Sequence, residues 1–319
     1  MILVLATQQD EHARAVIAEI TALGGNAALL DLAEFPQRLH MSLRYAESSR
    51  RFTFFSPDGD RSEPAFDLAE CRSIWWRRPQ QPVISDDIRD PTHQLFATNE
   101  AHEALAGLWY AVDAFWINDP ARDQLAHRKV YQLRVAQDVG LRIPQTLITS
   151  DPEAAREFIA DRRGDAVVFK AFSALPDEWR ETRLLGREEV DMLSNVRYAP
   201  VIFQEYIDAT YDLRVTVVGD RIFPAAIHSQ ETSYKVDFRM DMANAKVEAV
   251  DLPARVEKKL HALMDRLGLV YGAIDMRLTP SGEYVFLEIN PAGQWLFVEQ
   301  HTRQPIAAEI ARLLVEHGK

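Results

Sequence analysis

Two acidic residues and an asparagine in the last third of the chain have a spacing that could hold a metal ion. Glu288 and Asn290 are two residues apart in an apolar run, so on a β-strand both would project from the same face. With a four-residue loop at 279–282, Asp275 would lie opposite Phe286 and diagonal to Glu288. Carboxylate and amide oxygens suit Mg²⁺, which takes few protein ligands and leaves room for phosphates. A solvated strand face is the alternative, and a one-residue register change would move Asp275 to the other face.

Two lysines could supply cations for a phosphate group. Lys170 ends the apolar run Val167–Lys170, where a lysine either binds phosphate or reaches the surface along its alkyl chain. Lys129 is expected in the middle of a helix, and its neighbours do not distinguish it from a surface residue. Taken alone, the sequence around each lysine favours the surface interpretation.

Paired arginines follow two tryptophans in the segment Trp75-Trp76-Arg77-Arg78-Pro79. Arginine beside aromatic rings could hold a substrate carboxylate through its planar fork of donors. A buried ion pair between domains explains the same pattern nearly as well. Both interpretations of Arg77 and Arg78 stay open.

Composition excludes several classes of protein. A length of 319 residues predicts about two domains, and the formal net charge of −12 argues against a non-specific nucleic-acid binder. Cys71 is the only cysteine, which excludes an internal disulfide and a thiolate metal cluster. No apolar run approaches the ~18 residues of a membrane span, and the short apolar start is expected to be a strand and not a signal peptide. A cytoplasmic enzyme with access to ATP is therefore expected.

Strands and helices that would position these residues alternate along the chain. Strands at 2–6 and 27–30 flanking a helix at 11–23 predict an α/β layer. A long helix at 93–115 ends before Asn118-Asp119-Pro120, where the first domain boundary is expected. Further helices are expected at 121–139, 152–160, 256–267 and 306–314, and further strands at 41–45, 51–55, 73–77, 145–148, 166–170, 201–207, 213–218, 222–229, 272–278 and 284–290.

In order and spacing, residues 121–319 resemble the ATP-grasp superfamily. The resemblance implies a hinge strand that meets adenine of ATP through its backbone and an acidic residue that takes the ribose hydroxyls. It also implies two lysines on the phosphates and a Mg²⁺ site on the acidic hairpin. The corresponding residues are Gln204, Glu205, Tyr206 and Ile207 for the hinge, Asp212 for the ribose, Lys129 and Lys170 for the phosphates, and Asp275, Glu288 and Asn290 for the metal. No Gly-rich phosphate lid is found between Lys170 and Gln204, so that role is unassigned.

Motifs spread over the whole chain are similar to those of the graspetide ligases, the microviridin-type peptide macrocyclases. They are Trp75 to Pro79, Trp116-Ile117-Asn118, and residues 140–146, 212–219 and 287–295. The resemblance implies an α/β (α+β) protein with an N-terminal α/β pre-ATP-grasp domain at 1–118, a central ATP-grasp subdomain at 119–203 and a C-terminal one at 204–319. A homodimer is expected.

Such enzymes phosphorylate an Asp or Glu side chain of a ribosomally made precursor peptide, which has a leader and an acidic core. A hydroxyl or amine of the same peptide then closes an ester or amide ring. Arg214, two residues after Asp212 on one strand face, is expected to stabilise the transferring phosphoryl group or hold the substrate, with a surface ion pair as the alternative.

Two rival functions remain at this point. One is an amino-acid or peptide ligase of the ribosomal-protein glutamate ligase or glutathione synthetase type. The other is a regulator that binds nucleotide without turnover, which is disfavoured because the metal-site residues and both lysines are present.

Overall fold

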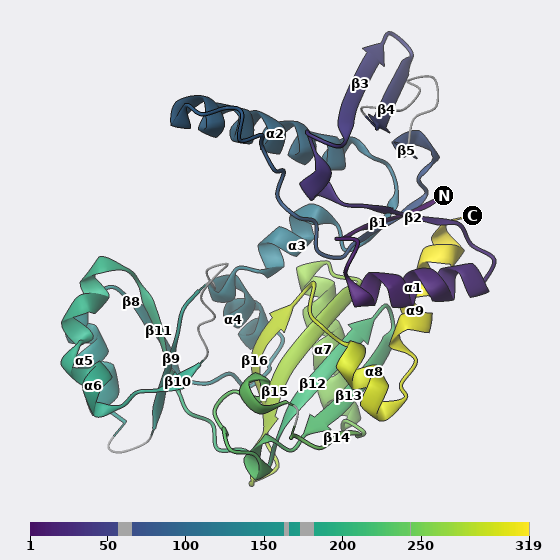
Figure 1. The fold of residues 1–319 in the computed structure, drawn as a ribbon. Helices are drawn as coiled ribbons and strands as arrows, with labels where there is room; N and C mark the ends of the chain where they lie inside the picture. The colour runs from purple at the N-terminus through teal and green to yellow at the C-terminus, as the bar shows by residue number, and fades with distance from the viewer. Residues whose placement is uncertain (57–65, 163–165, 173–181, 243, 319) are drawn as a thin grey trace.

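The N-terminal part of the chain forms a parallel sheet with the strand order β2-β1-β6-β7 (Figure 1). The computed structural model describes residues 1–56, 66–162, 166–172, 182–242 and 244–318. Strand β1 is buried along its length, as expected for an interior parallel strand, and helix α1 begins where Asp10 accepts a hydrogen bond from the Ala13 backbone. The elements are β1 (Ile2–Leu5), α1 (Glu11–Ala22), β2 (Ala27–Leu30), β6 (Ser73–Trp76) and β7 (Phe115–Ile117).

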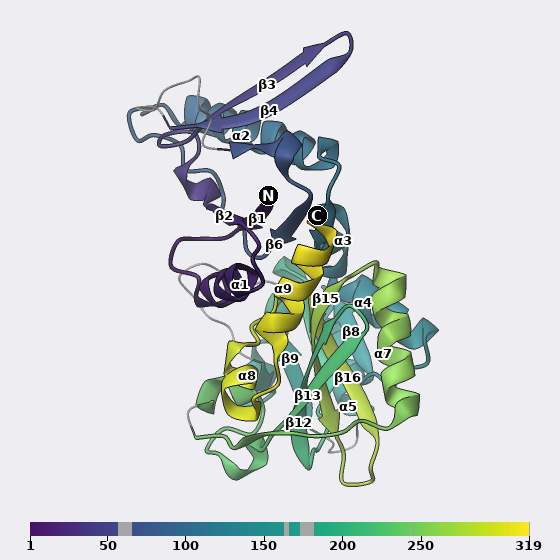
Figure 2. The same cartoon turned by 90° about the vertical axis from the view of Figure 1, so that its right-hand side faces the viewer.

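A second, antiparallel sheet and a long helix extend from this layer. Helix α2 begins with Pro91, and the preceding Asp90 caps two backbone N–H groups. Figure 2 shows α2 and the β3–β4 hairpin together at the end of the molecule away from the large C-terminal sheet. The elements are β3 (His40–Ala46), β4 (Ser49–Phe55), β5 (Phe66–Asp67) and α2 (Pro91–Ala111).

The central part contains a small antiparallel sheet in the order β10-β9-β11-β8, which packs against helix α5 and a 3-10 helix at Leu193–Tyr198. Two helices, α3 and α4, connect it to the N-terminal layer. The elements are α3 (Pro120–Ala126), α4 (Lys129–Asp138), β8 (Thr146–Thr149), α5 (Pro152–Ala160), β9 (Val167–Lys170), β10 (Arg183–Leu184), α6 (Arg187–Asp191) and β11 (Val201–Glu205).

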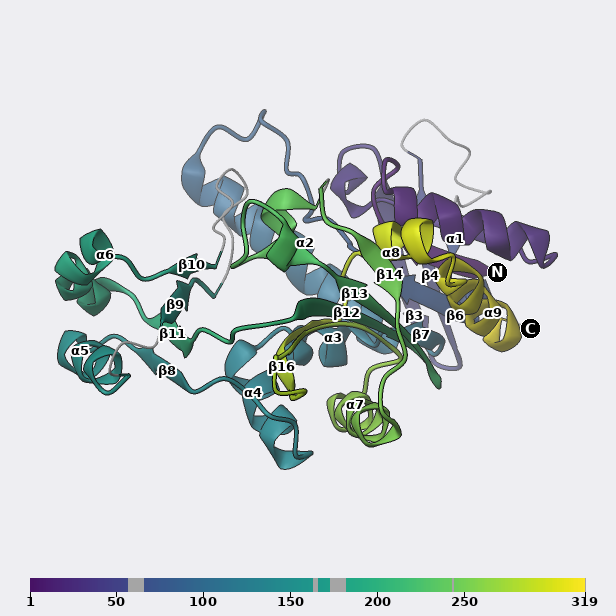
Figure 3. The ribbon, with the colours of Figure 1, turned by 90° about the horizontal axis from the view of Figure 1, so that it is seen from below.

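A five-stranded antiparallel sheet, ordered β14-β13-β12-β15-β16, forms the C-terminal part. Figure 3 shows α7 on one face of this sheet and α8 on the other. Alternate residues of β12 pack toward α7, so the remaining ones, including Asp212 and Arg214, face the opposite side. The elements are β12 (Tyr211–Val218), β13 (Arg221–Ile227), β14 (Val247–Ala249), α7 (Ala254–Leu267), β15 (Tyr271–Leu278), β16 (Tyr284–Asn290), α8 (Leu296–Thr302) and α9 (Ile306–His317).

One hydrophobic cluster joins the N-terminal layer to the C-terminal sheet. Val16 of α1 and Ile310 of α9 belong to this cluster, and the Ser73 hydroxyl donates to the Leu314 carbonyl at 2.7 Å. Asn118 adds hydrogen bonds to the backbone of Tyr271 and Pro291. The two parts are therefore packed as one body, and the N-terminal layer contacts the loop that follows β16.

Two predicted helices differ from the observed ones. The predicted helix at 93–115 ends at Ala111, because the aromatic and β-branched residues that follow form β7 beside β6. The predicted helix at 121–139 is two helices, α3 and α4, separated at His127 and Arg128. No helix in the described ranges is both long enough and apolar enough to cross a membrane.

Candidate active site

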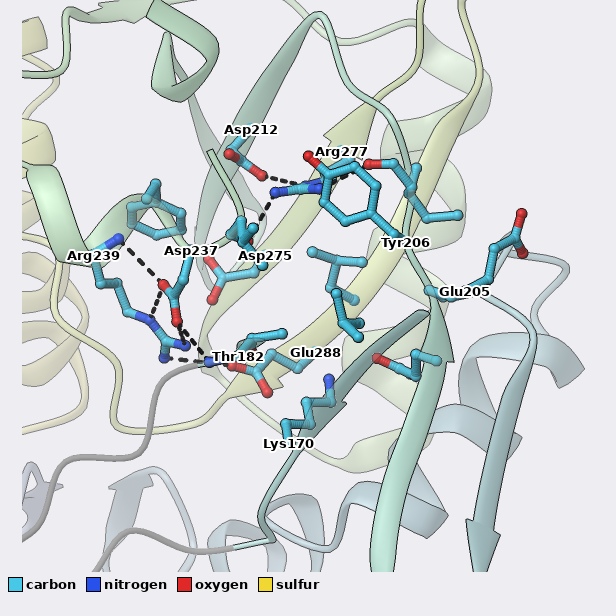
Figure 4. Close-up of a pocket in the computed structure, with 17 residues that line it drawn as sticks. Lys170, Thr182, Glu205, Tyr206, Asp212, Asp237, Arg239, Asp275, Arg277 and Glu288 are labelled. Atoms are coloured by element: carbon cyan, nitrogen blue, oxygen red, sulfur yellow. Dashed lines mark hydrogen bonds and ion pairs between the residues drawn. The ribbon is translucent and has the colours of Figure 1, made fainter. Parts of the chain in front are cut away.

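A pocket between the small and large sheets brings together most of the residues predicted to bind nucleotide and metal. Figure 4 shows Lys170, Tyr206, Asp212, Asp275 and Glu288 around it. They come from β9, the end of β11, the start of β12 and the β15–β16 hairpin, which are far apart in sequence. The predicted residues that line the pocket are Lys170, Gln204, Glu205, Tyr206, Ile207, Asp212, Asp275 and Glu288.

Asp275 and Glu288 are direct partners across the β15–β16 hairpin. The predicted pairing of Asp275 with Phe286 is wrong, because the hairpin loop is one residue longer than expected and Leu278 pairs with Tyr284. That slip alone would place Asp275 opposite Leu287, on the wrong face. A bulge next to Asp275 absorbs Leu287 as an extra residue, and this returns both carboxylates to one face.

Cations hold the Glu288 carboxylate in its ionised form. Lys129 Nζ lies 2.6 Å from Glu288 Oε2, and Arg239 Nη1 lies 3.8 Å from Glu288 Oε1. Burial alone would raise the pKa of Glu288, but Lys129, Lys170 and Arg239 together hold this pKa well below its usual value. Glu288 is thus an anion held among positive groups.

The Asp275 carboxylate has a different environment. Burial raises the pKa of Asp275 to about 6, a shift that Arg214 opposes and Glu288 increases. Arg214 Nε lies 3.3 Å from Asp275 Oδ1, but neither atom has a hydrogen-bond partner within the described ranges. Asp275 Oδ1 is therefore a buried oxygen with capacity for a further ligand.

These residues have donor groups that fit Mg²⁺. The described residues contain no group of three or more His, Cys, Asp or Glu that could hold a metal ion. Two carboxylates and an amide suit Mg²⁺, because its remaining coordination positions are taken by phosphate and water. Asn290 Oδ1 accepts a hydrogen bond from the Ala292 backbone at 3.0 Å, and the Asn290 side chain lines a neighbouring cleft and not this pocket.

Both predicted lysines lie beside Glu288. Lys170 faces the pocket at the end of β9, and burial lowers its pKa to about 8 while Glu288 partly opposes the shift. Lys129 is expected in the middle of a helix from the sequence. In the structure it is the first residue of α4, because the helical conformation is interrupted at the two preceding residues. This position lets the ammonium group of Lys129 reach Glu288.

The hinge and the predicted ribose ligand are held by protein contacts. Gln204 is buried and donates to the Thr146 hydroxyl, whereas the Glu205 carboxylate points away from the pocket in Figure 4. Asp212 is buried, and its two oxygens accept hydrogen bonds from Arg277 and Ser229. Burial raises the pKa of Asp212, and Arg277 opposes that shift.

Two features of the pocket were missed from the sequence. Arg277 links Asp212 to the carbonyl of Ile207 at 2.7 Å, and its place two residues after Asp275 on the same strand face could have revealed it. Asp237 and Arg239 form a two-bond ion pair at 2.6 and 2.7 Å over the pocket. They lie in a polar stretch without periodicity, so no pattern indicated them.

None of the three arginines predicted to bind substrate is among the described residues that line this pocket. Arg214 is buried behind Asp275, with the rings of Phe238 and Phe297 at 5.6 and 5.8 Å. Arg77 is 2% exposed and donates to the carbonyls of Ala292 and Gly293 at 2.6 and 3.1 Å.

Arg78 is half-buried and donates to the Ala292 carbonyl at 3.0 Å. Both Arg77 and Arg78 line the neighbouring cleft that Asn290 also lines.

Comparisons with known proteins match two family models to the chain. Residues 1–124 match the family described as the MvdD pre-ATP grasp domain, and residues 126–314 match the RimK-like ATP-grasp domain. No match is found among curated proteins.

Several solved structures are similar over the whole chain. The macrocyclase MdnC from Microcystis aeruginosa, bound with precursor peptide MdnA, is 31% identical, with coverage of 99% of both chains and a TM-score of 0.87. A RiPP-associated ATP-grasp ligase from Chryseobacterium gregarium, in complex with ADP and a leader and core peptide, is 28% identical, with 99% of this chain and 96% of that chain covered and a TM-score of 0.89. Macrocyclase MdnB from Microcystis aeruginosa is 29% identical, with 98% coverage of both chains and a TM-score of 0.81.

Proposed function

The chain belongs to the RimK-like ATP-grasp family, and from this premise we propose that it is an ADP-forming ligase that closes macrocycles in a precursor peptide. The observation that carries the proposal is the pair Asp275 and Glu288, opposed on one hairpin and flanked by Lys129 and Lys170. The precursor peptides recorded with similar proteins at 31% and 28% identity support a peptide substrate.

The reaction has two steps. The γ-phosphoryl group of ATP passes to an Asp or Glu carboxylate of the peptide, which gives an acyl phosphate and ADP. A hydroxyl or amine of the same peptide then attacks the carbonyl carbon. Inorganic phosphate leaves as the ester or amide forms, so each ring removes one water from the peptide.

In this proposal the side chains of the pocket bind and orient ATP. The hinge at 204–207 holds adenine. Asp212 accepts a hydrogen bond from a ribose hydroxyl, because its carboxylate oxygens keep lone pairs that its protein partners do not use. Lys129 and Lys170 would bind the phosphates, and Asp275 and Glu288 would hold Mg²⁺. Asn290, which lines the adjoining cleft, is the proposed third ligand. When bound, Mg²⁺ neutralises phosphate charge. Cations aimed at the transferring group lower the barrier to phosphoryl transfer.

Co-expression with an acidic, Thr-containing peptide encoded beside the gene tests the function. The expected product is lighter than the precursor by one water per ring, and its formation requires ATP and releases ADP. Treatment with mild base then separates ester rings, which open, from amide rings, which do not. A peptide of unchanged mass after incubation with active, ATP-binding protein would contradict the proposal.

We further propose that the protein is a homodimer located in the cytoplasm. The cytoplasmic location rests on the requirement for ATP. The dimer rests on apolar side chains of α2, because Leu95, Phe96 and Tyr110 are 62%, 64% and 61% exposed. Light scattering at several protein concentrations tests the dimer, and the mass of one chain at every concentration would exclude it.

A further inference from the structure

A second cleft begins where the metal-site strand ends. It lies between α2, residues 76–82, α3 and the loop after β16, and has a volume of about 740 Å³. Figure 1 shows α3 between α2 and the large sheet. Asn290 lines this cleft, and Glu288, two residues earlier on the same strand face, lines the nucleotide pocket. The cleft therefore adjoins the end of the pocket where the carboxylates lie.

A histidine–aspartate pair lies in the wall of this cleft. Asp123 is 6% exposed, and its Oδ1 lies 3.2 Å from His127 Nδ1, while its Oδ2 is buried without a hydrogen-bond partner within the described ranges. His127 Nδ1 also lies 2.8 Å from the Asp123 carbonyl. With two oxygens facing it, Nδ1 carries the proton, which leaves Nε2 as the acceptor.

The position of His127 along the chain places it near the reaction. Lys129, two residues later, contacts Glu288 at 2.6 Å. His127 lies in the break between α3 and α4, and its side chain is 49% exposed and lines the cleft. A partly exposed imidazole beside a buried carboxylate can exchange protons with a bound substrate.

The cleft also has the charge for an acidic peptide. The whole chain has a net charge of −12, yet Arg77, Arg78 and Arg128 line this cleft together with Trp76 and Trp109. Arginine binds carboxylates, and aromatic rings pack against a peptide chain. A hydroxyl-bearing segment with neighbouring acidic side chains therefore fits this surface.

We propose that this cleft holds the core segment of the peptide, and that His127, oriented by Asp123, accepts the proton of the attacking hydroxyl. In this step the hydroxyl oxygen bonds to the carbonyl carbon of the acyl phosphate, the bond from carbon to the phosphate oxygen breaks, and the hydroxyl proton passes to His127 Nε2. The inference rests on the proposed function, since it assigns the second half-reaction. Asp123 is a positioning residue, because it acts through His127.

The purely structural alternative is that His127 only ends helix α3. His301 provides a matched comparison, because its Nδ1 lies 2.7 Å from the Phe297 carbonyl four residues earlier and its side chain is exposed. Among the described residues, His301 has no carboxylate partner like that of His127, and it is not among the residues that line the cleft.

The test separates peptide activation from ring closure. The probe is the acidic, Thr-containing precursor peptide encoded beside the gene, used in single turnovers with wild type, His127→Asn, His127→Gln, Asp123→Asn and His301→Asn. Hydroxylamine traps the acyl phosphate as a hydroxamate, and mass spectrometry counts rings. We expect hydroxamate formation at the wild-type rate in both His127 variants and ring closure slowed about a hundredfold or more, in the range of general-base catalysis. His301→Asn should match wild type in both steps.

The pH profile separates a positioning role from a structural one for Asp123. The charged and titratable groups that line the cleft with His127 are Arg77, Arg78, His102, Tyr110, Asp123 and Arg128, and the charge of Lys129 also opposes protonation of His127. Ring closure in wild type should slow as the pH falls and His127 becomes protonated. In Asp123→Asn the midpoint of this loss should move to lower pH, because the carboxylate stabilises the imidazolium.

Three outcomes decide the proposal. Rings closed at the wild-type rate by folded His127→Asn and His127→Gln would overturn it. Hydroxamate formation reduced by the same factor as ring closure would place His127 in activation, and would overturn it too. A wild-type protein that forms neither hydroxamate nor rings would refute the proposed function itself, so the two failures are distinguishable.

Discussion

Lys129 Nζ lies 2.6 Å from Glu288 Oε2, so a predicted phosphate ligand contacts a predicted metal ligand. The two residues come from α4 and β16, 159 positions apart in sequence. Both groups are about one-fifth exposed, so this contact is more than a solvent-screened surface pair. In the proposed function, ATP with Mg²⁺ would give each group a new partner of opposite charge, the phosphates for Lys129 and the cation for Glu288.

Replacing Glu288 with Ala should abolish ADP formation at ordinary Mg²⁺ concentration. The reason is that Lys129, Lys170 and Arg239 lose their anionic partner and the metal loses a carboxylate. Asn290→Ala should act in the same direction through the amide. Steady-state ADP release measures the effect, and Glu283→Ala is a matched control because Glu283 is an exposed carboxylate at the turn of the same hairpin.

Comparable unfolding temperatures are needed to interpret these variants. Glu288 and Asn290 lie outside the apolar cores, so both proteins should fold. ADP release near the wild-type rate from both would remove the hairpin from the mechanism.

Replacing Lys170 with Ala should weaken ATP binding by ~1.5–3 kcal/mol, the range for a hydrogen bond to a charged group. Because burial lowers the Lys170 pKa to about 8, the ammonium is charged below that pH and neutral above it. ATP affinity of the wild type should therefore fall as the pH rises through about 8. Calorimetry at pH 7 and pH 9 measures both effects, and Lys170→Arg should keep its affinity at the higher pH. Equal affinities of wild type and Lys170→Ala at pH 7 would return Lys170 to a surface role.

The fold and most of the pocket could be predicted because their signals are local. Strand periodicity placed Glu288 and Asn290 on one face. Lys170 was assigned through the resemblance to the ATP-grasp superfamily, because its local sequence alone favours a surface residue. The register of Asp275 could not be predicted, because it depends on a longer loop and a bulge at Leu287 that compensate for each other. The residue types of the hairpin indicate neither the longer loop nor the bulge.

Long-range contacts explain the other misses. Arg239 is held over the pocket by its ion pair with Asp237 and by its proximity to Glu288. No periodic pattern of residue types in the sequence indicates these contacts. The break between α3 and α4 occurs without Gly or Pro, at His127 and Arg128, so pattern rules extended one helix across it. Between Lys170 and Gln204, where the sequence has no Gly-rich phosphate lid, residues 173–181 lie outside the described ranges.

His12 should make stability dependent on pH. It is 9% exposed, with its ring 4.9 Å from that of Trp295, and burial together with Arg77 lowers its pKa from 6.5 to about 3. Above pH 6.5 the group is neutral in both states. As the pH falls from about 6.5 to about 3, the unfolded chain binds a proton that the folded protein does not, so the free energy of unfolding decreases.

Urea unfolding at pH 7.5 and pH 5 measures this effect. Wild type should lose more stability over that interval than His12→Gln, and the difference between the two proteins removes the contribution of all other titrating groups. His40→Gln is a control, because His40 is exposed on β3. An equal loss in wild type and His12→Gln would show that His12 is protonated without cost in the folded state.

Substitution of Arg77 should change the stability of the protein, whereas substitution of Arg78 should change its affinity for the peptide. Arg77→Met removes two charge-assisted hydrogen bonds from a fully buried side chain and should lower stability by about 3 kcal/mol. Arg78→Ala should leave the fold intact, since Arg78 is half-buried and makes one such bond, but should raise the KM for the peptide. Unfolding free energies and peptide titrations measure the two effects, and an unchanged peptide KM for Arg78→Ala would make this residue structural as well.

Arg214 is buried behind Asp275. It can act on the transferring phosphoryl group directly or through the Asp275 carboxylate, and kinetic measurements distinguish these two roles. Arg214→Ala should lower kcat and kcat/KM about equally if the guanidinium stabilises the transferring phosphoryl group, because that interaction exists only in the transition state. If Arg214 acts through Asp275, its loss raises the Asp275 pKa further, because the opposing cation is gone. The activity of the variant should then recover at high Mg²⁺ and at higher pH, where Asp275 is ionised. An assay of ADP release across Mg²⁺ concentration and pH distinguishes these cases, and wild-type activity in Arg214→Ala would exclude both.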